Sequence, residues 1–171
     1  MDEAELDAHL WAGKSARKRI LYQCACCRAI WPKLNDGRTW EAVHIAELCA
    51  DELVPESEFR AVASTVTAAW GAFLCEVERD ADFRTAQYAL LREVIGYPER
   101  TAPFQLAWCT STVLSVAQAM YESRDFGAMP ILADALQDAG CDNADVLDHC
   151  RDANAPHVRG CWVVDLVLGK E

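Results

Sequence analysis

The sequence lacks a long apolar run and a start of the kind that directs a chain to export. Its longest apolar runs fall far short of the roughly 20 residues that a membrane-spanning helix needs. The chain opens with Met1, Asp2 and Glu3, whereas a secretory signal opens with basic and then apolar residues. We therefore expect a cytoplasmic protein with no membrane partner.

Positive charge is also scarce. The chain carries 16 lysines and arginines against 27 aspartates and glutamates, which gives a net charge of −11. The phosphates of nucleic acids and the headgroups of acidic lipids repel a protein of this charge. The charge balance therefore argues against a nucleic-acid partner, and we expect the acidity to serve solubility.

Motifs of the common enzyme classes are missing. The sequence contains no Gly-x-Ser-x-Gly, no phosphate-binding glycine loop and no His-Glu-x-x-His. A helical di-iron site needs two Glu-x-x-His motifs, and only Glu41 to His44 supplies one. No residue is therefore predicted to be catalytic, and we do not expect an enzyme.

Length and apolar content favour one domain. A chain of 171 residues with 52% apolar residues can bury roughly two-thirds of its unfolded surface in one core. Apolar residues recur at helical spacing, and no pair of segments alternates as partner strands do. We predict an all-α fold with a single domain, residues 1–171, built as a bundle of about seven or eight helices.

The helix predicted at 57–79 has two distinct sides. One side carries large apolar residues, and the other carries the small residues Ser64, Ala68, Gly71 and Cys75. Small residues allow the backbone of another helix to approach closely. We therefore place this small-residue-faced helix at the centre of the bundle. The last apolar segment, 162–168, fits a buried strand or a helix, and we prefer a helix because no partner strand is predicted.

Metal-capable side chains gather in the last 31 residues. Five of them lie close together in the sequence: Cys141, His149, Cys150, His157 and Cys161. Zinc takes four such ligands in a tetrahedron, commonly as two close pairs. His157 and Cys161 share a face if their segment is helical, and Cys24 and Cys27 could supply a further pair. The tail is therefore a candidate zinc site.

The same residues also fit a packed tail without any cofactor. A buried free cysteine behaves as a small hydrophobic residue. His157 or Arg159 would then pair with an aspartate to fasten the last two helices, and the candidates are Asp145, Asp148 and Asp165. Under either hypothesis we expect His157, Cys161 and Cys141 to lie close together.

The number of cysteines is odd. Nine cysteines in a chain without an export signal indicate reduced thiols or metal ligands rather than a disulfide framework. Cys24 and Cys27 are spaced as in proteins that exchange dithiols. Reactivity needs a lowered thiol pKa, which a helix N-terminus or nearby cations provide, and this pair lies in mid-helix. Thiol redox chemistry is therefore only a second alternative.

Two stretches resemble a known family. They are Tyr22 to Trp31, which contains Cys-Ala-Cys-Cys-Arg, and the tail from Leu132 to Asp165, which contains Gly-Cys-Asp-Asn-Ala-Asp and His-Val-Arg-Gly-Cys-Trp-Val-Val-Asp. Both are similar to a family of small uncharacterised helical proteins abundant in planctomycete genomes. That family carries no assigned activity, so the resemblance implies a shared fold and no chemistry.

The function predicted first is that of a non-enzymatic interaction or adaptor module whose partner is another protein. Six tryptophans exceed what one small core usually requires, and Trp11 and Trp108 are the ones expected on a partner-binding surface. The alternative from another class is a structural zinc protein that uses the Cys/His-rich tail. The thiol redox protein is the second alternative.

Overall fold

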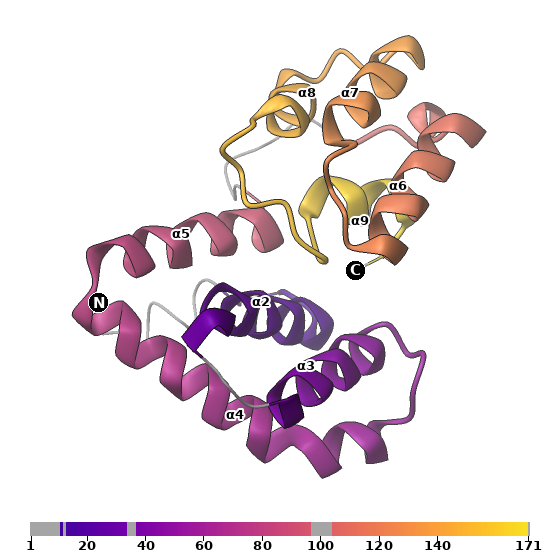
Figure 1. Ribbon diagram of the computed structural model, residues 1–171. Coiled ribbons are helices and arrows are strands. Elements are labelled where there is room, and N and C mark those ends of the chain that lie inside the picture. The colour runs from indigo at the N-terminus through magenta and orange to yellow at the C-terminus, as the bar shows by residue number, and fades with distance from the viewer. Residues whose placement is uncertain (1–10, 12, 34–36, 97–103, 171) are drawn as a thin grey trace. The chain divides into compact units, whose positions relative to one another are not determined.

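The structure, a computed structural model, describes residues 11, 13–33, 37–96 and 104–170. These residues form eight α-helices and no strand (Figure 1), so the predicted all-α fold is confirmed. Within the same residues, no helix combines the length and the hydropathy that a membrane crossing requires.

The chain divides into two compact units, Met1–Leu90 and Leu91–Glu171. The division falls inside helix α5 (Ala81–Ile95), so the last turn of this helix belongs to the second unit. This division is based on contacts and does not show whether either unit folds without the other. The single domain expected from the length therefore stays a prediction.

Three helices of the first unit pack on one another: α2 (Ala16–Ala29), α3 (Gly37–Ala50) and α4 (Glu56–Arg79). A short 3-10 helix, Trp31–Lys33, follows α2. Ser15 caps the start of α2, because its hydroxyl accepts a hydrogen bond of 3.3 Å from the backbone N–H of Lys18.

Helix α4 contacts both α2 and α3, but α2 and α3 also contact each other, so the contacts do not single out α4 as the central helix that the sequence predicted. The buried side of α4 consists of Val66, Ala69 and Phe73. The small-residue stripe predicted to receive another helix is mostly exposed at Ser64, Ala68 and Cys75. A Cβ added to Gly71 would meet nothing within 4 Å. The predicted role of the stripe is therefore wrong, because apolar side chains and not a close backbone approach make these helix contacts.

The two tryptophans expected on a partner-binding surface are buried. Trp11 is 7% exposed and packs on Tyr22, with ring centroids 5.4 Å apart. Trp108 is 4% exposed, lies in the 3-10 helix Leu106–Trp108 and packs edge-on against Phe104. The prediction for both residues is wrong, since a position near a helix end or in a connection does not prevent a large aromatic ring from entering the core.

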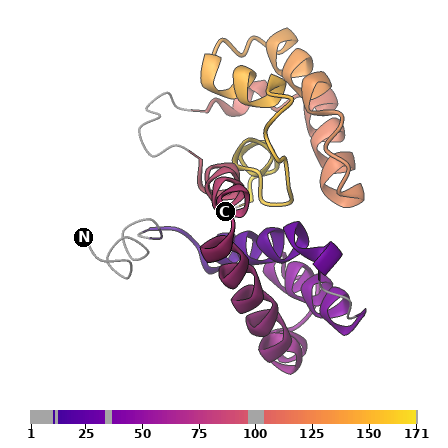
Figure 2. The same cartoon turned by 60° about the vertical axis from the view of Figure 1, so that its left-hand side comes forward.

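Four helices of the second unit contact one another in a ring: α6 (Ser111–Ser123), α7 (Met129–Asp138), α8 (Ala144–Arg151) and α9 (Trp162–Leu168). Figure 2 shows these orange to yellow helices from a second side. They enclose an apolar core that includes Leu132, Leu136 and Val163. The last apolar segment is helical, as preferred, and Gly169 ends it at a φ of 65°.

Candidate metal centre

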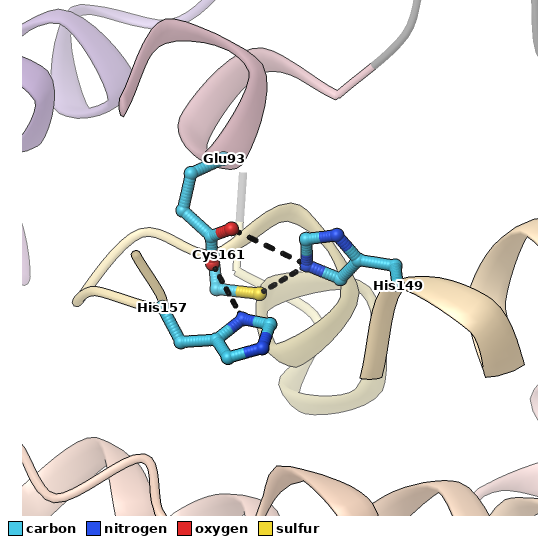
Figure 3. A group of neighbouring side chains, drawn as sticks. All are labelled: Glu93, His149, His157 and Cys161. Carbon is cyan, nitrogen blue, oxygen red and sulfur yellow. Dashed lines mark hydrogen bonds and ion pairs between the residues drawn. The ribbon is translucent and has the colours of Figure 1, made fainter. Parts of the chain in front are cut away.

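Four metal-capable side chains meet in the second unit: Glu93, His149, His157 and Cys161 (Figure 3). One ligand atom from each lies within 4.8 Å of the other three. Glu93 belongs to α5 and His149 to α8, His157 lies in the connection between α8 and α9, and Cys161 is the N-cap residue of α9. The group therefore joins four separate segments of the chain.

The backbone around Cys161 is held by local hydrogen bonds. Its N–H donates to the carbonyl of Val158 at 2.9 Å, and its carbonyl accepts from the N–H of Asp165 at 2.9 Å. Gly160 forms the turn at a φ of 96°, where residues with a side chain are disfavoured. This turn places the Cys161 thiol at the start of α9 and inside the core, where it is 0% exposed.

Glu93 is positioned by the close packing of the end of α5 on α9. Gly96, at a φ of 77°, ends the helix three residues after Glu93. A Cβ at Gly96 would lie 3.3 Å from Cγ of Trp162, the first residue of α9. The Trp162 ring also lies against His149, with centroids 5.1 Å apart. Trp162 therefore packs on both the helix end that carries Glu93 and the ring of His149.

Three contacts within the group lie near the edge lengths of a tetrahedral zinc site. His157 Nδ1 lies 3.2 Å from Glu93 Oε1, and His149 Nε2 lies 3.5 Å from Glu93 Oε2 and 3.3 Å from Cys161 Sγ. Zinc bonds to nitrogen, oxygen and sulfur set the edges of such a tetrahedron at about 3.3 to 3.6 Å. Three of the contacts are therefore already close to the spacing that a bound ion requires.

The electrostatics of the group favour a cation. Burial raises the pKa of Glu93, but hydrogen bonds from His149 and His157 outweigh it and hold the pKa at about 2. Burial, and then the charge of Glu93, raise the pKa of the Cys161 thiol well above its usual value. A divalent cation would stabilise both the carboxylate and the thiolate, and a coordinated thiol loses its proton.

The structure brings together three of the five tail residues proposed as ligands, His149, His157 and Cys161. Cys141 and Cys150 are buried in the same apolar core and are not members of the ligand group. The expected closeness of His157 and Cys161 is confirmed, but Cys141 does not join them in the group. Cys24 and Cys27, named as further ligands, belong to the first unit and pack in its apolar core.

Glu93 was not predicted as a ligand. It is 64 positions from His157, the residue whose Nδ1 it contacts. One sequence signal was present, since Glu93 follows the buried Leu90 by three residues and precedes the buried Val94 on an amphipathic helix. A carboxylate on the apolar side of a helix indicates a buried partner, and the partner of His157 is this glutamate rather than a tail aspartate.

The three cysteines of α2 lie in surroundings that disfavour the thiolate. Cys24, Cys26 and Cys27 are all buried, and burial raises the pKa of Cys27 to about 12 although Arg28 lowers it. Burial also raises the pKa of Cys24 well above its usual value. All nine cysteines, each within the described residues, are free. A catalytic dithiol requires the opposite shift, so these surroundings argue against dithiol exchange by Cys24 and Cys27.

Comparison with known proteins supplies no further assignment. No family model matches the chain, and no curated protein and no solved structure matches it. The resemblance to the planctomycete family therefore stays an expectation, and function has to be argued from the site itself.

Proposed function

We propose that this protein binds a zinc ion through Glu93, His149, His157 and Cys161, and that the ion is structural. The observation that supports this most directly is the convergence of four ligand atoms within 4.8 Å. Structural zinc sites are closed by four protein ligands, whereas catalytic sites keep one position for water or substrate. Four protein groups, all largely buried, favour the closed type.

The donor set favours zinc over the common hard cations. One thiol and two imidazoles suit borderline metals such as zinc, while calcium and magnesium are held by oxygen ligands. Ionised Glu93 and Cys161 would together balance the charge of a divalent ion. The site would then be neutral, which reduces the cost of burying charged groups.

A metal would stabilise a part of the chain with short elements. Helix α8 has 8 residues and α9 has 7, and helices of this length are not stable by themselves in water. Ligands on α5, α8, the connection and α9 would tie these elements together. Structural zinc contributes binding free energy on the order of 10 kcal/mol, enough to determine whether a small unit folds.

The test is elemental analysis of the full chain purified without a metal-affinity tag. We expect one zinc per chain and a lower melting temperature after treatment with a chelator. Protein that contains no metal, takes none up and melts at the same temperature with and without chelator would contradict the proposal. Trp11 and Trp108 are buried and so do not support a protein partner, which stays a prediction.

A further inference from the structure

We propose that the metal enters and leaves this centre through a pocket beside His157, and that His157 is the ligand that detaches. This inference rests on the proposed zinc site and adds a route of exchange to it. The pocket has a volume of about 380 Å³ and is lined by the start of α7, the end of α8 and the connection that follows α8. Of the four ligands, only His157 lines it.

The four ligands differ in how firmly they are held. The side chains of Glu93 and His149 are 1% and 7% exposed and stand on helices, and Cys161 is 0% exposed at a helix start. His157 is the most accessible, at 11%, and it stands on the irregular connection. Displacing His157 therefore disturbs no helix.

The His157 ring also lacks a second hydrogen bond. Its Nδ1 faces Glu93, while its Nε2 is buried and has no hydrogen-bond partner in the described part of the chain. A metal-bound histidine is normally oriented by a hydrogen bond from its other ring nitrogen. Without that bond, only the contacts at Nδ1 and the packing of the ring oppose its departure.

The pocket offers groups that can receive a cation. Its lining includes the acidic residue Asp152 and the cysteine Cys150. The backbone N–H of Asn154 donates to Oδ1 of Asp152 at 2.9 Å, which restricts the orientation of the carboxylate. During release, the bond from the metal to His157 Nδ1 breaks as a bond to an incoming donor forms, with no change of oxidation state. Uptake follows the same steps in reverse.

The experiment measures zinc transfer in both directions by stopped flow, with a small fluorescent chelator as acceptor. Ala155→Phe fills the pocket, and Ala119→Phe adds the same ring on the exposed side of α6 as the control. We expect Ala155→Phe to slow uptake and release by the same factor, severalfold, and to leave the Kd unchanged, because a blocked route does not alter the equilibrium. Ala119→Phe should leave both rates unchanged.

Asp152→Asn gives an independent measurement if the phenylalanine variant does not fold. It keeps the Oδ1 acceptor and removes the charge, so zinc uptake should slow, and more so at low ionic strength. Equal rates in Ala155→Phe and Ala119→Phe, or uptake by Asp152→Asn at the wild-type rate, would overturn the inference. A wild-type chain that takes up no zinc would instead refute the proposed function, so the two failures are distinguishable.

Discussion

Replacing Cys161 by serine separates a ligand from a packing residue, because the tail supplies a matched control. Cys161 and Cys141 are both buried, at 0% and 3% exposure, and both belong to the apolar core of the second unit. Only Cys161 lies in the ligand group, with its Sγ 3.3 Å from Nε2 of His149. Cys161→Ser and Cys141→Ser therefore make the same chemical change in similar surroundings.

The two variants should lose a similar amount of stability without metal. A serine at either position buries a hydroxyl in place of a thiol, which costs about 1 to 3 kcal/mol. Zinc distinguishes them. A free zinc concentration of about 100 times the Kd stabilises a one-site protein by about 2.7 kcal/mol. The wild type and Cys141→Ser should gain this amount, and Cys161→Ser should gain close to nothing.

The assay is urea unfolding of each protein with a chelator and with buffered zinc. Cobalt gives a second measurement, since a thiolate bound to Co²⁺ produces an absorption band in the near ultraviolet. The band should be present in wild type and in Cys141→Ser and absent in Cys161→Ser. Equal stabilisation of both variants by zinc, or a cobalt band that survives in Cys161→Ser, would refute the assignment of Cys161 as a ligand.

Two further substitution and labelling experiments test the packing. Gly96→Ala and Gly140→Ala both place a side chain at positive φ, 77° and 89°, but only at Gly96 does the new Cβ meet Trp162, at 3.3 Å. Each substitution should lower the free energy of unfolding by about 1 kcal/mol or more. Urea unfolding should show the larger loss for Gly96→Ala. Equal losses for the two variants would contradict the close packing of Gly96 on Trp162. Iodoacetamide at neutral pH should label the exposed Cys75 rapidly and the buried Cys26 slowly in the native protein, because burial raises the pKa of Cys26. Rapid labelling of any cysteine from Cys24 to Cys27, located by peptide mapping, would support the redox hypothesis instead.

Local signals predicted much of the fold. The apolar period of 57–79 predicted α4 to within one residue at its start. The helix at the end of the chain followed from the absence of a partner strand. Such features depend on neighbouring residues, which the sequence displays directly.

Burial of individual side chains was harder to predict. Trp11 and Trp108 lie close to a helix end or in a connection, positions that suggested exposure, and both are buried. The small side of α4 suggested a close helix contact, and most of it is exposed. In each case the outcome depends on which element packs against the residue, and the local pattern does not contain that information.

The ligand group shows the same division between local and distant information. Composition pointed to the tail, and His149 and Cys161 are only 12 positions apart. Glu93 stands 64 positions from His157, and no local pattern connects two residues at that separation. Nor could composition separate Cys161 from Cys141 and Cys150, since all three are buried cysteines of one core.

The glutamate, rather than the cysteines, gives the strongest argument for a cation at this site. Buried thiols are common as packing residues, so Cys161 alone would carry no functional meaning. A charged carboxylate at 1% exposure is costly unless cationic or hydrogen-bonding partners surround it. Glu93 has two imidazoles beside it, and the nearest additional group is a thiol that a metal would ionise. Hydrogen bonds from the two imidazoles account for the glutamate and apolar packing accounts for the cysteine, whereas one divalent ion would interact favourably with all four groups.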